Sequence, residues 1–382
     1  MRRNLASRLA PGRMARVLCV ALACLAGGTA AAEEVIIGWA GPERQPHAQA
    51  LKQGVELAIA EANQRGVQVQ GRRLEFKLLA YDDNGNPNVS GFAAQALVTG
   101  KAVAVVGHYT TETTLAGAQV YAEKGVAELA VFSPSPRLTQ MGYKNVFQLI
   151  GNITDATTYM TAAVNRMGSG ERRLTIAYNG SIMGAAVADA LEQEMRKQGG
   201  QLAGRVSISA RTSDFNAVLK TVRDNKADLL YFAGIQEQAF ALSQRLRGAN
   251  LKVQLMLSGG AFNTDFYSGA GGYREGTLLM AHNRPESQLP GFARFEKAYT
   301  AMFHAPVMPY VANAYDAAGM VIEAIRRGNT TEPVAISAQL HAMSYEGVTG
   351  RIAFDADGRL LNPGYTLYEV SQKKWKVVRS FP

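Results

Sequence analysis

The stretch Val103-Ala-Val-Val-Gly-His-Tyr-Thr-Thr-Glu-Thr-Thr114 decides the fold, because it joins a buried strand to the start of a helix. Residues 103–106 are apolar and mostly β-branched, which is typical of a strand buried on both faces. Gly107 ends the run, and four threonines precede a helical pattern over 115–124. Hydroxyl side chains cap helices, and a helix start beside a strand end also suits a carboxylate. The stretch fits either role, capping alone or ligand binding.

The first 32 residues have the features of a secretory signal. Five arginines and no acids accompany an apolar run over 17–26, which is too short to span a bilayer. Ala30-Ala-Ala32 then precedes Glu33 as a cleavage site would. We expect a signal peptide at 1–32 and export to the periplasm. Lipidation at Cys24 is the alternative, although Ala21-Leu-Ala-Cys24 is a poor lipidation sequence.

Charge and cysteine content limit the function of the remaining chain. The chain has 40 basic and 31 acidic residues, so removing the five leader arginines leaves 35 against 31. No basic block remains, and we expect no nucleic-acid partner. Both cysteines, Cys19 and Cys24, lie in the leader, and the five histidines are scattered. We therefore predict no disulfide, no metal site and no cofactor.

Alternation of strand and helix patterns predicts the fold class. Two runs of such units, over 35–150 and 174–281, are followed by too few helices for a third domain. We expect an α/β fold with two doubly wound parallel-sheet lobes joined by three crossover segments. The crossovers are predicted near 148–153, 280–285 and 344–349. The N-terminal lobe then comprises 33–150 plus 284–345, and the C-terminal lobe comprises 151–283 plus 346–382.

The order of several short motifs carries a resemblance. They are Gly41-Pro42, Tyr81-Asp82-Asp83, Gly107-His108 with its hydroxyl residues, Phe132-Ser-Pro134 and Tyr315-Asp316-Ala317. This order resembles the leucine/isoleucine/valine-type periplasmic binding proteins, the receptors of branched-chain amino-acid ABC importers, over essentially all of 35–382. The resemblance implies a type I periplasmic-binding-protein fold that closes on a small-molecule ligand. It also implies a membrane permease as partner, and we expect a monomer that is not an enzyme.

The resemblance implies binding positions on both lobes. On the first lobe, the segment that grips the ligand carboxylate maps to Tyr109, Thr110 and Thr111. Ser133 belongs to the Ser-Pro motif, and Ser135 takes the small position after it. Pro136-Arg137 then follows directly in place of the family's threonine. On the second lobe, the family's tyrosine, aromatic residue and acidic ammonium anchor fall on Met183, Ile235 and Gly259.

Loss of the acidic anchor shapes the expected ligand. A desolvated ammonium needs a carboxylate or several acceptors, and the sequence does not show whether Glu112 or Glu237 substitutes. We therefore hypothesise a ligand other than an ordinary α-amino acid. Its carboxylate or amide head would face Thr110 and Thr111, and its apolar or aromatic tail would face Met183, Ile235 and Ala261. An amino-acid-binding protein with a rearranged ammonium site remains the alternative.

Three further residues each have two interpretations. Arg44 is either a bidentate carboxylate contact or a surface residue, and Trp39 is either a stacking wall of the cleft or part of the core. Tyr310 matches an aromatic that the family places near the ligand, or it packs the helix start.

Two other functions are compatible with an exported protein of this fold class. A secreted hydrolase would share these layers, but no Gly-x-Ser-x-Gly elbow or paired-histidine motif is present. A soluble sensor for a membrane receptor is not distinguished from a transport receptor by the sequence.

Overall fold

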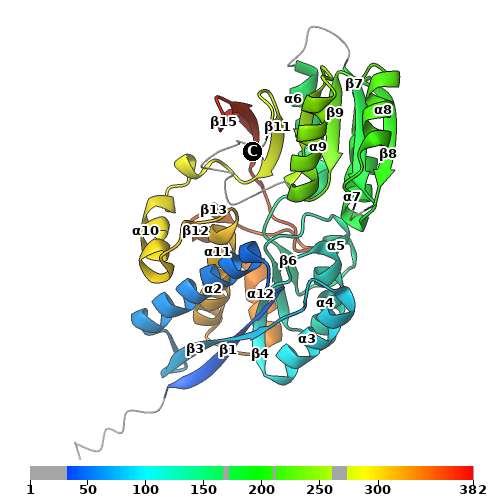
Figure 1. The fold of residues 1–382 in the computed structure, drawn as a ribbon. Helices are drawn as coiled ribbons and strands as arrows, with labels where there is room; N and C mark the ends of the chain where they lie inside the picture. The colour runs from blue at the N-terminus through cyan, green and yellow to red at the C-terminus, as the bar shows by residue number, and fades with distance from the viewer. Residues whose placement is uncertain (1–31, 167–171, 210–211, 260–272, 382) are drawn as a thin grey trace, which may run out of the picture.

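The computed structural model describes residues 32–166, 172–209, 212–259 and 273–381, which form two lobes (Figure 1). The first lobe contains a sheet with strand order β2-β3-β1-β4-β5-β6. Its strands pair in parallel except for β2, which is antiparallel to β3. The strands are β1 (Glu33–Ala40), β2 (Gln68–Val69), β3 (Arg72–Tyr81), β4 (Ala102–Gly107), β5 (Ala127–Ala130) and β6 (Val146–Gln148).

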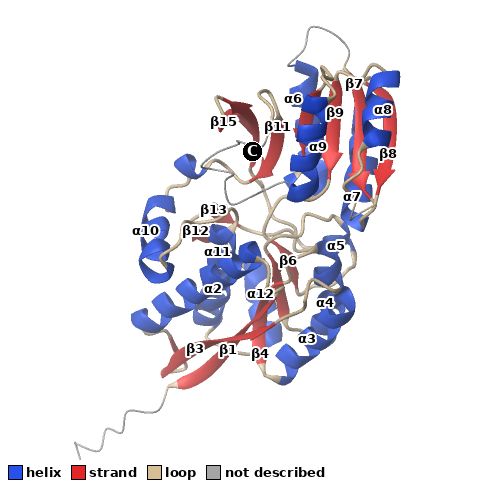
Figure 2. Cartoon of the chain, in the orientation of Figure 1, coloured by secondary structure: helices blue, strands red, loops and turns tan. Residues whose placement is uncertain are grey.

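Helices cover both faces of this sheet (Figure 2). In β4, Ala104 and Val106 join the large core cluster on one face, whereas Val105 packs with the smaller cluster on the other. This alternation confirms that the apolar run is a strand buried on both faces. One face carries α2 (Pro46–Arg65), α10 (Phe292–Phe303), α11 (Val311–Gly328) and α12 (Pro333–Ala342), and the other carries α3 (Pro87–Thr99) and α4 (Thr111–Lys124).

The second lobe is built on a sheet with order β15-β14-β11-β10-β9-β7-β8. Parallel pairing holds from β11 to β8, while β14 is antiparallel to both of its neighbours. Its strands are β7 (Arg173–Asn179), β8 (Gln201–Ile208), β9 (Leu229–Ala233), β10 (Gln254–Leu257), β11 (Leu278–His282), β14 (Tyr365–Ser371) and β15 (Lys374–Phe381). Its helices are α6 (Ile153–Arg166) and α7 (Ile182–Lys197) on one face and α8 (Asn216–Asp224) and α9 (Gln236–Gly248) on the other.

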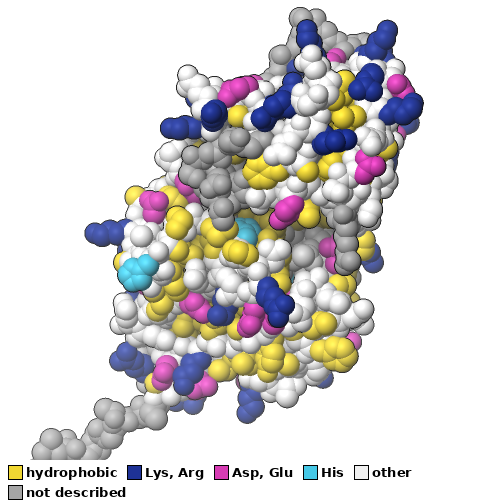
Figure 3. Space-filling model, viewed as in Figure 1, with side chains coloured by type: hydrophobic (Ala, Val, Ile, Leu, Met, Phe, Trp, Pro, Cys, Tyr) yellow, Lys and Arg dark blue, Asp and Glu magenta, His cyan; other side chains and the backbone are white. Residues whose placement is uncertain are grey.

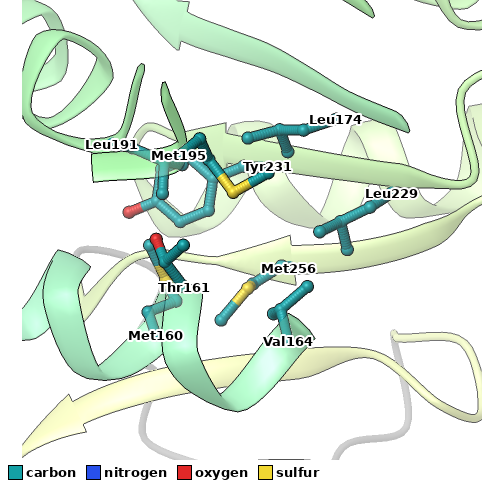
Figure 4. A pocket seen from close by; sticks show the side chains of 9 residues that line it. All are labelled: Met160, Thr161, Val164, Leu174, Leu191, Met195, Leu229, Tyr231 and Met256. Atoms are coloured by element: carbon teal, nitrogen blue, oxygen red, sulfur yellow. The ribbon is translucent and has the colours of Figure 1, made fainter. Parts of the chain in front are cut away.

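A small void lies inside the second lobe between α6, α7 and the sheet (Figure 4). Its volume is about 10 Å³, and its lining includes Met160, Leu191 and Met256. A space of this size is at the lower limit for one water molecule and far below that of a ligand pocket. The void is therefore a packing defect of the core rather than a candidate site.

The predicted fold class is confirmed, because two mainly parallel sheets with helices on both faces form two lobes. The first two crossovers follow β6 and β11, as expected. The third differs from its predicted position near 344–349. There, β12 (Tyr345–Gly347) and β13 (Gly350–Ile352) form a hairpin, and Ile352 and Phe354 pack into the first lobe's core cluster. We propose the two-lobe division with residues 346–354 assigned to the first lobe.

Asn313 of α11 forms hydrogen bonds with two of the three crossovers. Its Nδ2 donates to the backbone oxygen of Leu149 at 3.2 Å, and its Oδ1 accepts from Asn283 Nδ2 at 2.7 Å. The backbone N–H of Asn283 donates to Gly364 O at 2.7 Å. Gly364 lies at the end of the third crossover, directly before β14, so this bond joins the third crossover to the second. Because all three segments are bonded to one another, any movement of one lobe against the other bends them together.

Replacement of Asn313 by alanine is expected to lower the free energy of unfolding by about 1–2 kcal/mol, because buried partners lose their hydrogen bonds. Urea unfolding followed by circular dichroism measures the change. Asn88→Ala is a matched control, because Asn88 is exposed in the first turn of α3. Equal stability of the two variants would contradict a structural role for the Asn313 hydrogen bonds.

Candidate ligand-binding site

Thr110 caps α4 rather than standing free. Its Oγ1 accepts from the backbone N–H of Thr113 at 3.2 Å, and its own N–H donates to Thr113 Oγ1 at 3.0 Å. This reciprocal capping box starts the helix at Thr111, four residues before the pattern over 115–124. Thr110 therefore caps the helix, and its contact with a ligand stays a prediction.

Thr111 and Ser133 bring the ends of two strands together. The Ser133 hydroxyl donates to Thr111 Oγ1 at 3.2 Å, so the Thr111 hydroxyl keeps its own hydrogen. The backbone N–H groups of Thr111 and Glu112 are the first two of α4 and have no acceptor within the helix. Gln148 Nε2 donates to the backbone oxygens of Ser133 and Ser135 and holds this loop in place. The result is a cluster of donors with a positive dipole end.

A buried polar chain supports the loop between β4 and α4. His108 Nδ1 lies 2.7 Å from Asp83 Oδ2 and 2.8 Å from Ser90 Oγ, and its Nε2 lies 3.1 Å from the Tyr121 hydroxyl. Gly107 has φ +134°, and a Cβ there would lie 2.5 Å from the backbone oxygen of Ala40. Only glycine fits this conformation without strain. The loop that presents Thr110 and Thr111 is therefore rigidly supported.

An aromatic cluster adjoins the threonines. Tyr109 stacks on Phe132 with ring centroids 5.2 Å apart, and Phe132 lies 5.2 Å from Tyr310. His47 of α2 contacts Phe132 at 5.0 Å, and its Nδ1 lies 3.1 Å from the Tyr109 hydroxyl. Sequence reasoning missed His47 as a site residue. Its position directly after Pro46, at the start of a predicted helix, was the only local signal.

Exposure to solvent distinguishes the three residues that have two interpretations, Trp39, Tyr310 and Arg44. Trp39 is only 2% exposed and belongs to the core cluster, so it is not a wall of the cleft. Tyr310 is buried, and its hydroxyl accepts from the backbone N–H of His282 at 3.3 Å. Its ring packs against Phe132 of the aromatic cluster. Arg44 is exposed on the loop after β1.

The second lobe contributes the starts of α7 and α9. Met183 is half-buried in the first turn of α7, and Ile235 is 47% exposed directly before α9. Gly259 follows β10, and Ala261 lies outside the described residues. Ile182 is 55% exposed beside Met183 and was missed by the sequence reasoning. Two exposed isoleucines at neighbouring helix starts offer apolar surface to a ligand.

The negative charge of Glu237 in α9 acts on Tyr109 of the first lobe. Burial, and after it the negative charge of Glu237, raises the pKa of the Tyr109 hydroxyl above its usual range. Glu237 lies in the first turn of α9, which follows β9 on the side of the second lobe that faces the first (Figure 1). The start of α9 therefore faces the first lobe. Figure 3 shows the surface hollowed between the lobes, with hydrophobic side chains along the hollow.

Within the described ranges, no three His, Cys, Asp or Glu side chains group as a metal site would require. Across the same ranges, no helix combines the length and the apolar character needed to cross a bilayer.

Two lobes joined by three crossovers are the arrangement of two-lobed solute-binding proteins. The chain matches the family model described as "Periplasmic binding protein" over residues 35–374, and it belongs to that family. The fold is the type I fold of the leucine/isoleucine/valine-type receptors, which serve ABC transporters.

Two named relatives are similar to this chain over most of its length. The chain is 26% identical over 363 residues to the leucine-, isoleucine-, valine-, threonine- and alanine-binding protein of Pseudomonas aeruginosa, covering 94% of this chain and 95% of that one. The Leu/Ile/Val-binding protein of Escherichia coli is 25% identical, with 90% and 92% covered.

Solved structures share the fold. A leucine-binding protein from Thermotoga maritima has a TM-score of 0.77 at 19% identity and covers 91% of this chain and 98% of its own. A solute-binding protein from R. palustris in complex with benzoate has a TM-score of 0.78 at 16% identity, with 91% and 96% covered.

Proposed function

We propose that this protein captures a small carboxylate at the start of α4 and delivers it to the permease of an ABC importer. The observation that carries this proposal is the donor cluster, in which the Thr111 hydroxyl and the first two N–H groups of α4 donate to no other described residue. Such a cluster suits a carboxylate or an amide oxygen. The leader over 1–32 supports a periplasmic location, and we propose a monomer.

The ligand's tail is proposed to be apolar or aromatic rather than that of an ordinary branched-chain amino acid. Ile182 and Ile235 expose apolar surface on the facing lobe, and Gly259 provides no acidic side chain for an ammonium. Solved neighbours at low identity include complexes with benzoate and with 4-hydroxybenzoate, which have this chemistry. We therefore propose an aromatic or similarly apolar carboxylate as the ligand class.

One observation favours a second candidate, an amino acid bound through a rearranged ammonium site. The charge of Glu237 acts on Tyr109 and would provide an acidic partner from a different helix. Isothermal titration with benzoate, 4-hydroxybenzoate, leucine, isoleucine and valine distinguishes the two. Micromolar binding of a branched-chain amino acid, without binding of the aromatic acids, would overturn the proposed ligand class.

Replacement of Thr111 by valine is expected to weaken carboxylate binding about tenfold or more, because one donor to the ligand is lost while the shape is kept. Titration of wild type and variant with the tightest-binding acid of the panel measures this. Thr99→Val is the matched control, because Thr99 lies at the exposed end of α3. Unchanged affinity of Thr111→Val would place the ligand elsewhere.

A further inference from the structure

We propose that Tyr109 and Glu237 form an acceptor pair, contributed by the two lobes, that selects carboxylates also bearing an O–H or N–H donor. The inference deepens the proposed function and rests on its carboxylate site at the start of α4. It adds a second point of recognition, and it makes His47 a positioning residue.

The hydrogen-bond direction at Tyr109 follows from His47. His47 Nε2 lies 2.7 Å from the backbone oxygen of Pro309, which only accepts, so Nε2 carries the hydrogen. Burial lowers the pKa of His47, so the ring is neutral at pH 7 and its Nδ1 is an acceptor. The Tyr109 hydroxyl, 3.1 Å away, must therefore donate to Nδ1.

This direction decides what Tyr109 offers a ligand. A phenol has one hydrogen, and here it is committed to His47, so the oxygen presents only lone pairs to other groups. Stacking on Phe132 holds the ring in place. Tyr109 therefore does not donate to the ligand carboxylate, although the resemblance groups it with Thr110 and Thr111. It accepts from a donor instead.

Glu237 supplies the second acceptor. It lies in the first turn of α9, which begins where β9 ends, on the side of the second lobe that faces the first (Figure 1). A carboxylate has acceptors only. Across the described parts of the chain, no salt bridge or hydrogen bond joins its side chain to another residue, and it is exposed. A donor on a ligand bound between the lobes would then meet two acceptors, Tyr109 from one side and Glu237 from the other.

A donor-free ligand would leave this pair without hydrogen bonds once the lobes exclude water. Sites built to bond a ligand hydroxyl discriminate strongly against the analogue that lacks it. Even a partly hydrated pair should give a preference of about tenfold. The expected ligands are therefore hydroxy- or amino-substituted carboxylates rather than plain ones.

The test compares benzoate, the three hydroxybenzoate isomers, the three methoxybenzoates and leucine by isothermal titration. In the wild type, at least one hydroxybenzoate should bind about tenfold more tightly than benzoate and its methoxy analogue. Glu237→Gln and Tyr109→Phe should each reduce that preference, because the amide has one acceptor oxygen in place of two and phenylalanine has none.

His47 variants separate positioning from folding. In His47→Leu the Tyr109 hydroxyl regains a free hydrogen, so the preference should fall. In His47→Gln the amide can donate to Pro309 O and accept from Tyr109, so the preference should be retained. Equal preference in His47→Leu and wild type would overturn the inferred hydrogen-bond direction.

The remaining outcomes separate the two proposals. If benzoate and every hydroxybenzoate bind equally, or the preference persists in Glu237→Gln and Tyr109→Phe, the acceptor pair is wrong and the carboxylate site stands. If no aromatic acid binds, and leucine either does not bind or binds Glu237→Gln as well as it binds the wild type, both proposals fail. If leucine alone binds and Glu237→Gln abolishes that binding, the acceptor pair is supported and the proposed ligand class is wrong.

Discussion

Replacement of Asp316 by alanine is expected to lower the free energy of unfolding by about 3 kcal/mol, the largest loss among the substitutions considered. Asp316 in α11 is fully buried and accepts from the backbone N–H groups of Val348 and Thr349, each at 2.8 Å. The Thr349 hydroxyl donates to it at 2.7 Å. Alanine would leave these donors without an acceptor where water has little access.

Urea unfolding at pH 7 measures this loss. Asp357→Ala is the matched control, because Asp357 is 62% exposed in an ion pair with Lys144 and should contribute less than about 1 kcal/mol. Gly347 is adapted to the same contact, since a Cβ there would lie 2.5 Å from the Asp316 carboxyl carbon. A Gly347→Ala variant should therefore be destabilised as well. Similar stability of Asp316→Ala and Asp357→Ala would contradict this account.

The Asp316 contact also explains why one crossover was misplaced. Strand and helix patterns predict β1, β3, β4 and the parallel core because apolar periodicity is local. In the β12–β13 hairpin, β12 has only three residues, too few for a pattern. It stays on the first lobe because Val348 and Thr349 bond a carboxylate more than thirty residues earlier in the chain. Nothing in residues 344–349 shows that contact.

In the candidate site, too, local features could be predicted from the sequence, whereas features that depend on distant residues could not. Thr110 and Thr111 were predicted because capping residues and motif order can be read within a dozen positions. Their separate roles could not be predicted, since the Thr111 hydroxyl depends on Ser133, 22 residues away. The direction of the Tyr109 hydrogen bond depends on His47 and, through it, on Pro309, which is 262 residues further along the chain. Trp39 was ambiguous because burial at a strand end is set by the neighbouring elements.

Replacement of Glu128 by methionine is expected to stabilise the protein by about 1–3 kcal/mol at pH 8, because it removes a carboxyl group that is wholly enclosed. Glu128 lies in β5 between Val105 of β4 and Val146 of β6 and is 0% exposed. Among the described residues, neither of its side-chain oxygens has a hydrogen-bond partner. The nearby Tyr121 hydroxyl is engaged by His108 instead.

The same substitution should change how stability depends on pH. Burial raises the pKa of Glu128 well above its usual range, whereas the unfolded chain has an ordinary value of about 4.3. The folded state therefore binds the proton more tightly, so this group's contribution to stability is full below pH 4 or so and is lost as pH rises towards the folded pKa. Methionine does not titrate, and its advantage over wild type should grow between about pH 5 and pH 8.

Urea unfolding at several pH values measures both effects, with Glu123→Met as the matched control. Glu123 lies exposed near the end of α4, so its loss should alter stability by less than about 0.5 kcal/mol at any of these pH values. A Glu128→Met protein that is less stable than wild type throughout, or whose advantage is the same at pH 5 and pH 8, would mean that Glu128 has a stabilising partner. Growth of the advantage with pH would instead show that the first lobe folds around a neutral carboxyl group, whose ionisation the close packing of β4, β5 and β6 opposes.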